Sequence, residues 1–198
     1  MKLLIVADGP RDEASLPPLI ESILGRPIEF EFKPWGRLHH EGSQRGYGRK
    51  LAYSIGQARS RRADGLVAVV DRDKDRSGQR GRDLTEAREA ERQSGREIFP
   101  TVLGVADPHV DVWLLDDPVA VRQGLGLSSD AEIINVRREK DPKGELDKLI
   151  GAKNDRDRME TLKAIAAQVS PKRCAHASET GLKSFVEDCQ RELANLPK

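Results

Sequence analysis

Short strand-like segments, separated by stretches with helical spacing, constrain the fold of this 198-residue chain more than any other feature. The expected strands are Lys2–Ala7, Ile28–Phe32, Gly65–Val70 and Thr101–Ala106. Gly65–Val70 (GLVAVV) is the most continuous apolar run, whereas Ile28–Phe32 (IEFEF) alternates apolar and acidic residues, as a half-exposed edge strand does. Strands that alternate with helices predict an α/β fold, in which a mostly parallel sheet is flanked by helices and joined by right-handed crossovers.

The helical pattern divides the chain into two parts. Between the expected strands, apolar residues recur at helical spacing in Ser15–Leu24, Gly48–Arg62 and Asp83–Gln93. After about residue 110 the strand pattern fades, and helices are expected at Val112–Leu115, Asp141–Ile150, Asp155–Val169 and Thr180–Leu196. We therefore predict an α/β domain over residues 1–123 and a helical C-terminal extension, packed on it, over residues 124–198. The stretch Gly124–Asp130 is the expected joint.

Two local signals refine the expected helix boundaries. In Ser15–Leu24, Pro17 and Pro18 are compatible with a helix if they occupy its first turn. Asp141-Pro142 is a start signal, with Asp as the N-cap and Pro at the first helical position.

The composition excludes several classes of protein. The chain carries 34 Lys and Arg against 33 Asp and Glu, a net charge of +1, which argues against a histone-like polyelectrolyte. It has no apolar run of about 18 residues, as a membrane span needs, and its N-terminal apolar run is too short for a secretory signal. Cys174, His176 and Cys189 would supply three zinc ligands where a closed site needs four, so two ordinary thiols are expected. We therefore expect a cytoplasmic protein with no membrane association.

Acidic residues follow the expected strands at the points where these end. Asp8 and Asp12 follow the first strand, Asp71 and Asp73 follow Gly65–Val70, and Asp111 follows the last strand after a short loop. Because the carboxyl ends of parallel strands meet at one edge of a sheet, these side chains are expected to lie close together. Clustered carboxylates repel one another and raise each other's pKa unless a cation neutralises them. Oxygen ligands of this kind suit Mg²⁺ or Mn²⁺.

Other interpretations of the acidic residues remain open. Asp71–Asp75 does not fit an EF-hand loop, because Arg76 and Arg82 stand where that loop needs Gly and Glu. An aspartyl phosphatase would have this strand first in the chain and a Thr shortly after it. Asp71–Asp75 also fits a solvated turn balanced by its own basic residues. Asp111 fits a helix N-cap as well as a metal ligand, and His109 fits a ligand, a general base or an exposed side chain.

A second pattern is basic. Between Gly36 and Arg62 the chain has seven Lys or Arg residues and a single acid, with His and Tyr residues interleaved. Such a patch beside a carboxylate–metal cluster suits a phosphodiester substrate. The candidate nucleic-acid-binding residues in and near this patch are Arg37, Arg45, Arg49, Lys50, Arg72 and Arg76. The alternative is an ordinary basic surface that keeps the protein soluble.

Several ordered motifs carry a resemblance to a known family. The matching stretches are Val6–Glu13 (VADGPRDE), Val69–Asp73 (VVDRD), Pro108–Asp117 (PHVDVWLLDD), Asp141–Ile150 (DPKGELDKLI) and Cys174–Leu193. An acidic residue before Gly after the first strand, followed later by Asp-x-Asp, resembles the Toprim (topoisomerase–primase) fold. The ordered set is similar to a family of bacterial Toprim-like proteins related to the nucleases of the OLD (overcoming lysogenisation defect) group. That family has Glu at the positions of Asp8 and Asp111.

The resemblance implies a metal-dependent nuclease. Two Mg²⁺ or Mn²⁺ ions, held by Asp8, Asp12, Asp71 and Asp73, would clamp the attacking and leaving oxygens of the scissile phosphate. Lys74, Arg72 or Arg76 would neutralise charge in the transition state. It also implies a nucleic-acid partner, with DNA favoured over RNA, and an ATPase partner in defence against mobile DNA. The first alternative is a non-catalytic Toprim-fold adaptor that binds nucleic acid or an ATPase partner. The second is an enzyme that transfers or hydrolyses phosphate on small molecules.

Overall fold

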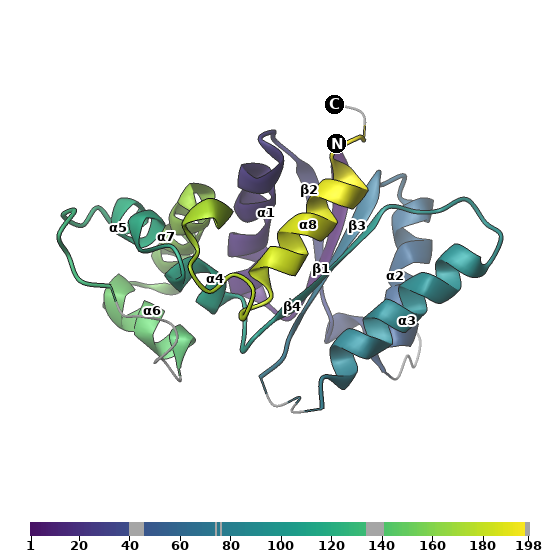
Figure 1. Cartoon of the computed structure of the whole chain (residues 1–198), viewed down its shortest axis with the longest axis horizontal. Helices are drawn as coiled ribbons and strands as arrows, with labels where there is room; N and C mark the ends of the chain where they lie inside the picture. The colour runs from purple at the N-terminus through teal and green to yellow at the C-terminus, as the bar shows by residue number, and fades with distance from the viewer. Residues whose placement is uncertain (40–45, 74, 76, 134–140, 197–198) are drawn as a thin grey trace.

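The fold is built on a four-stranded parallel sheet in the order β2-β1-β3-β4 (Figure 1). The computed structural model describes residues 1–39, 46–73, 75, 77–133 and 141–196. The strands are β1 (Lys2–Ala7), β2 (Glu29–Pro34), β3 (Gly65–Asp71) and β4 (Thr101–Ala106). This arrangement confirms the predicted α/β class and the edge position of the alternating IEFEF segment.

Helices cover both faces of the sheet, with α2 and α3 on one side and the remaining helices on the other (Figure 1). The helices are α1 (Pro10–Leu24), α2 (Tyr47–Ser60), α3 (Gln79–Gln93), α4 (Asp111–Leu115), α5 (Pro118–Leu125), α6 (Pro142–Ile150), α7 (Asp155–Gln168) and α8 (Leu182–Leu193). Short 3₁₀ turns lie at η1 (Arg37–His39) and η3 (Pro171–Arg173). Within the described part of the chain, no helix is long and apolar enough to cross a membrane.

Two hydrophobic clusters hold the layers together. Successive side chains of β1 point to opposite faces, so Leu3 and Ile5 join one cluster and Leu4 and Val6 join the other. Burial on both faces explains why β1 and β3 have continuous apolar sequences. The larger cluster contains residues from both sides of position 123, including the sheet, α1, α7 and α8. The division of the chain at residue 123 stays a prediction.

The start of α1 differs from the prediction. The helix begins at Pro10, so Pro17 and Pro18 are buried in its interior and not in its first turn. Proline at the first helical position costs no hydrogen bond, and the Asp12 carboxylate accepts the Gly9 N–H at the same end. These contacts stabilise a helix start one and a half turns earlier than the apolar periodicity indicates.

Helix α5 is absent from the prediction, although its start signal is present. Asp117 caps α5 by accepting the Ala120 N–H at 3.1 Å, and Pro118 occupies the first helical position. This Asp-Pro signal is the same as that of Asp141-Pro142, which starts α6. Because α5 has only eight residues, its apolar periodicity is too short to be recognised.

Helix α8 lies against β4 through a close contact. A Cβ atom at Gly104 would lie 2.9 Å from a ring carbon of Phe185, so glycine lets the ring approach the strand. Phe185 stacks on Trp113, with ring centroids 4.9 Å apart, and both side chains are fully buried. The approach positions the C-terminal helix along β4, at the edge of the sheet.

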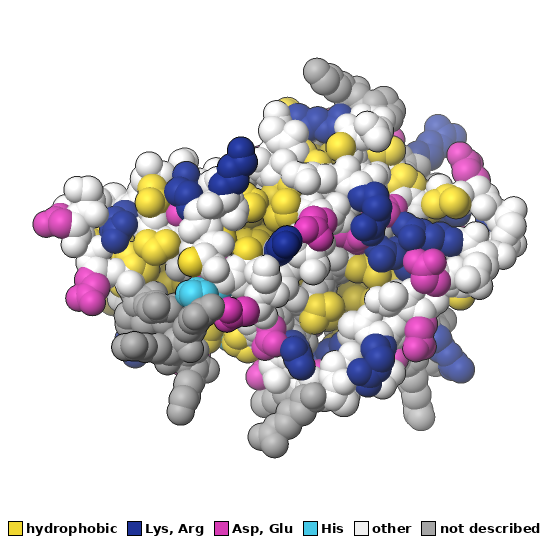
Figure 2. Space-filling view, in the orientation of Figure 1, with side chains coloured by type: hydrophobic (Ala, Val, Ile, Leu, Met, Phe, Trp, Pro, Cys, Tyr) yellow, Lys and Arg dark blue, Asp and Glu magenta, His cyan; other side chains and the backbone are white. Residues whose placement is uncertain are grey.

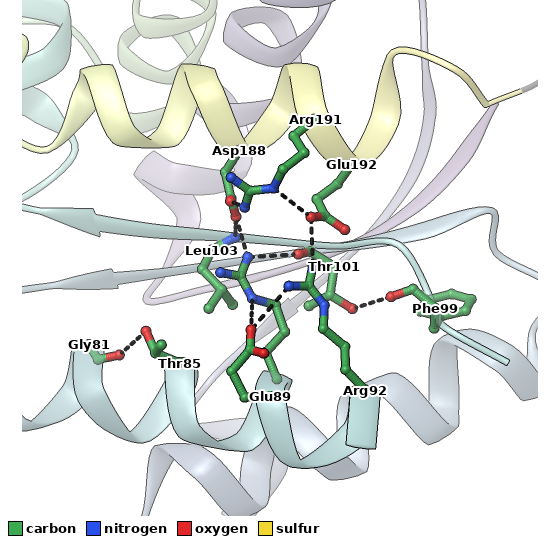
Figure 3. A network of polar contacts seen from close by, with 11 residues as sticks. Gly81, Thr85, Glu89, Arg92, Phe99, Thr101, Leu103, Asp188, Arg191 and Glu192 are labelled. Carbon is green, nitrogen blue, oxygen red and sulfur yellow. Dashed lines mark hydrogen bonds and ion pairs between the residues drawn. The ribbon is translucent and has the colours of Figure 1, made fainter. Parts of the chain in front are cut away.

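The outer edge of β4 is covered by a polar network between α3 and α8 (Figure 3). Asp188 Oδ2 accepts the Leu103 N–H at 2.7 Å and a hydrogen bond from Arg88 Nη1 at 2.6 Å. Arg88 Nη1 also donates to the Thr101 carbonyl at 3.2 Å, and Arg191 pairs with Asp188. Figure 2 shows Lys and Arg side chains beside Asp and Glu side chains on this face. Side chains thus form hydrogen bonds with the outward backbone groups of β4, which would otherwise be open to pairing with another strand.

Candidate active site

The carboxyl ends of β1 and β3 border a pocket of about 770 Å³. The residues predicted to form the metal site all line this pocket, namely Asp8, Asp12, Asp71, Asp73 and Asp111. Helices α1, α4, α6 and α7 supply most of the remaining wall. The strand-end pattern therefore identifies side chains that the fold brings together.

Asp12 is held at the N-terminus of α1. Its Oδ2 accepts the N–H groups of Asp8 at 2.9 Å and Gly9 at 3.0 Å, and the residue is only 7% exposed. Burial raises the pKa of Asp12 to about 6; the hydrogen bond from Gly9 lowers it, while the negative charges of Asp8 and Asp111 raise it further. The side chain holds the turn between β1 and α1 in a fixed position.

Asp71 and Asp8 form the centre of the acidic cluster. Asp71 ends β3, and its N–H donates to Asp8 Oδ2 at 3.4 Å. Burial, followed by the charges of Asp12, Asp8 and Asp111, raises the pKa of Asp71 to about 8. Desolvation within the pocket also raises the pKa of Asp8, although Asp8 is exposed at the rim of the pocket. At neutral pH Asp71 therefore holds a proton or attracts a cation.

Asp111 has cationic partners, whereas the Asp71 carboxyl has none among the described residues and is held by the Val110 N–H. Arg11 Nε donates to Asp111 Oδ1 at 2.9 Å, and His109 Nδ1 lies 3.2 Å from its Oδ2. Burial opposes ionisation of Asp111, but the His109 hydrogen bond and the Arg11 charge outweigh it and hold its pKa below the ordinary value. Asp111 makes no capping hydrogen bond at the start of α4, so it is not the N-cap. To bind a metal ion, Asp111 would first have to release Arg11.

The donor set suits a hard cation, although the side chains are not assembled into a ligand shell. Carboxylate oxygens at the end of a sheet are the donors that Mg²⁺ and Mn²⁺ take. Among the residues that the structure describes, however, no group of three or more His, Cys, Asp or Glu side chains stands in a metal-binding arrangement. Asp73 is exposed at the pocket, and Cys174 and Cys189 are free thiols. Binding of an ion would require rotation of the acidic side chains.

The predicted basic residues occupy different environments. Arg37 and Arg49 are exposed, as a phosphate contact requires. Arg72 is exposed and pairs with Asp107, its Nη1 lying 2.7 Å from Asp107 Oδ2. Three of the predicted residues lie outside the described part of the chain: Arg45, Lys74 and Arg76.

Lys50 does not lie on the surface like its neighbours. It is buried, and its Nζ donates to the Trp35 carbonyl at 3.1 Å while lying 5.4 Å from the centre of the Tyr47 ring. Arg80 lies 5.3 Å from the same ring, and its Nη1 donates to the Asp71 carbonyl at 2.8 Å. Arg80 therefore fixes the end of β3, a role that the sequence did not indicate because Arg80 lies in a uniformly charged helix.

The wall supplied by α6 and α7 carries two basic side chains that sequence reasoning missed, together with three carboxylates, Asp141, Asp147 and Asp155. Lys143 from α6 and Arg158 from α7 line this wall, and Lys143 is exposed. Arg158 Nε lies 3.8 Å from Asp147 Oδ1, beyond hydrogen-bond distance, whereas Arg11 Nη1 binds the same carboxylate at 2.7 Å. These residues are more than 130 positions from β1 in the sequence, so no local pattern connects them with the acidic cluster.

The fold and the pocket define an α/β protein with an acidic site at the carboxyl edge of a parallel sheet. Comparison of the chain with protein-family models, with curated proteins and with solved structures found no match. The resemblance to Toprim-like proteins therefore stays a hypothesis.

Proposed function

We propose that this protein is a metal-dependent phosphodiesterase that cleaves nucleic acid, with DNA favoured over RNA. The observation that carries the proposal is the acidic cluster, in which Asp71 has no cationic partner among the described residues and its pKa is raised to about 8 inside an open pocket. A carboxylate without a cationic partner in a cleft is a candidate functional group. A divalent cation would supply the missing positive charge.

The two walls of the pocket have complementary roles in this proposal. Asp8, Asp12, Asp71 and Asp73 would hold Mg²⁺ or Mn²⁺, which would ionise a water and stabilise charge on the phosphate. Lys143 and Arg158, on the wall supplied by α6 and α7, would bind phosphate oxygens of the substrate. The role of Lys74 as the group that neutralises transition-state charge stays a prediction.

The resemblance to Toprim-like proteins supports the same proposal. Its acidic positions fall on Asp8, Asp12, Asp71, Asp73 and Asp111, all of which line one pocket. From the relation to OLD-group nucleases we further propose that the protein acts with an ATPase partner in defence against mobile DNA.

Cleavage assays test the proposal. Purified protein is incubated with single- and double-stranded DNA and RNA in Mg²⁺, in Mn²⁺ and in EDTA. Cleavage is expected with metal, and it should fall below detection in the Asp71→Ala/Asp73→Ala double variant. Glu13→Ala/Glu160→Ala, which removes two exposed carboxylates outside this pocket, is the matched control and should retain full activity. Cleavage that survives the Asp71/Asp73 substitution, or that needs no metal, would exclude this mechanism.

The second candidate is a non-catalytic adaptor that binds nucleic acid or an ATPase partner. The pairing of Asp111 with Arg11 and His109 favours it, because one predicted ligand already has a cation. An adaptor would bind nucleic acid tightly and in a salt-sensitive manner, without turnover in any metal. The same assays, combined with a binding titration, separate the two functions.

A further inference from the structure

The two edges of the sheet differ in how their backbone groups are satisfied. The β4 edge is covered by Arg88 and Asp188, as described above. At the other edge, the Glu29 N–H donates to the Met1 carbonyl and the Trp35 N–H to the Ala7 carbonyl, so odd-numbered residues of β2 face β1. The even-numbered residues of β2 therefore point their backbone groups away from the sheet.

The outward groups of β2 are open. Among the described residues, none forms a hydrogen bond with the outward N–H and carbonyl groups of Phe30 and Phe32. The Phe30 side chain is 44% exposed, one of the large apolar side chains at the surface. Pro34, the next outward position, has no N–H and ends the row of donors. An unprotected edge with an exposed aromatic residue is a template for another strand.

We propose that two copies of this chain pair antiparallel through β2 and form one continuous eight-stranded sheet. In the register that satisfies both outward residues, Phe30 lies opposite Phe32 of the second copy, and Phe32 opposite its Phe30. These two pairs exchange the outward N–H and carbonyl groups of Phe30 and Phe32. Glu31 then lies on the two-fold axis, opposite its own copy.

The side chains in this register are self-complementary. On one face, Glu29 lies opposite Lys33 of the second copy, and symmetry repeats this opposite-charge pair. On the other face, Phe30 packs beside Phe32 of the second copy, which covers its exposed ring. The two Glu31 side chains meet at the axis, and each is already paired with Arg61 of its own chain. The charges of the strand therefore favour a second copy in this one register.

The dimer leaves the proposed active site complete in each chain. Because the paired β2 strands run in opposite directions, the carboxyl ends of the two sheets face opposite ways. Neither pocket receives a residue from the second copy, so the dimer and the proposed phosphodiesterase activity are independent.

Cysteine cross-linking tests the register. Opposite residues at a non-hydrogen-bonded antiparallel position have Cα atoms about 4.5 Å apart, within disulfide range. Glu31→Cys is therefore expected to give a disulfide-linked dimer on mild oxidation. Glu29→Cys, on the same face of the same strand, places the two cysteines about 13 Å apart and should give none. The wild-type chain, with its own Cys174 and Cys189, controls for background cross-linking.

Charge exchange gives a second, independent test, with light scattering after size-exclusion chromatography as the measurement of mass. Lys33→Glu places two acids opposite each other and should dissociate the dimer, whereas Glu29→Lys/Lys33→Glu restores opposite charges and should restore it. Phe30→Pro removes an outward N–H that β1 does not use, so it should give a folded monomer with unchanged cleavage activity. A wild-type monomer at all concentrations, equal cross-linking of both cysteine variants, or no rescue by the charge exchange would overturn the proposal.

Discussion

Carboxylates at two regions of this sheet differ in whether they have cationic partners. At the β4 edge, Asp188 is 6% exposed and is bound by Arg88, Arg191 and the Leu103 N–H. At the carboxyl end, Asp71 is surrounded by other acids, and its pKa is raised to about 8. The fold thus supplies cations to the carboxylate that closes the β4 edge. Where it supplies none, the carboxylate is available to bind a ligand or a proton.

The same contrast exists inside the pocket. Asp111 and Asp12 are equally buried, at 7% exposure each. Arg11 and His109 hold the pKa of Asp111 below its ordinary value, whereas burial beside other carboxylates raises the pKa of Asp12 to about 6. Burial alone therefore does not decide the charge of a carboxylate here; its nearest partner does.

The largest expected effect lies at the β4 edge. Asp188→Ala removes the buried ion pair of Arg88 with Asp188 and leaves the Leu103 N–H without an acceptor. Breaking a buried pair by removing one partner costs about 3–5 kcal/mol, so the free energy of unfolding in urea should fall by that amount. Thr85→Ala, an exposed change on the same face of α3, should change it by less than about 0.5 kcal/mol. A loss in Asp188→Ala no larger than that of the control would show that the network does not stabilise the fold.

The next effect concerns the partner of Asp111. Arg11→Met should lower the free energy of unfolding at pH 7 by about 2–3 kcal/mol, because it removes the Arg11 hydrogen bonds of the buried Asp111 carboxylate, which then keeps only its contact with His109. Without Arg11, the pKa of Asp111 should rise, so protonation at acid pH should remove part of this loss. Urea unfolding of the variant and the wild type at pH 5 and pH 7 measures both effects. A loss that is equal at the two pH values would mean that Arg11 acts through packing and not through charge.

Local patterns were sufficient to predict the sheet. The observed bounds of β1 and β4 match the predicted Lys2–Ala7 and Thr101–Ala106, because a strand buried on both faces must be apolar throughout. The strand-end pattern also predicted that Asp8 and Asp71 lie close together, since parallel strands end at a common edge, and both residues line one pocket. These inferences need only chain direction and hydrophobicity.

Pairing between distant residues could not be predicted in this way. Arg11 and Asp111 are 100 positions apart, and neither differs in its local sequence from an ordinary exposed charge. The prediction for Asp111 therefore considered a metal ligand or an N-cap and missed the arginine. Burial of Lys50 was missed for a similar reason, because its contact with the Trp35 carbonyl depends on how α2 packs on the sheet.

Asp71, which has no cationic partner among the described residues, should make the free energy of unfolding fall as the pH rises. The pKa of Asp71 is about 8 in the folded chain and about 3.9 in an unfolded one, so between these values the folded state binds the extra proton. Stability should therefore fall as the pH rises from about 4 to about 8. Asp71→Asn should flatten this dependence and raise the free energy of unfolding at pH 8 by at least about 1.4 kcal/mol, the value of one of the roughly four pKa units of the shift.

Urea unfolding in EDTA from pH 5 to pH 8 measures the slope, with Asp73→Asn, an exposed neighbour, as the control that leaves it unchanged. Adding Mn²⁺ at pH 8 should stabilise the wild type and not Asp71→Asn, because the cation takes the place of the proton. If the free energy of unfolding has the same slope against pH in the wild type and Asp71→Asn, the lack of a cationic partner at Asp71 has no effect on stability.

The smallest effect on stability is expected for an exposed ion pair at the same end of the sheet. Arg72 and Asp107 are bound at 2.7 Å, with 47% and 40% of their side chains exposed, so Arg72→Ala should cost only about 0.2–1 kcal/mol. If Arg72 exchanges Asp107 for a phosphate of the substrate, its removal should weaken nucleic-acid binding and reduce the slope of log affinity against log salt by about one. Arg96→Ala, an exposed arginine beyond the end of α3, should leave both the affinity and the slope unchanged. An equal loss of binding in the two variants would mean that the protein attracts nucleic acid by its overall charge, and that the exposed pair is no part of the site.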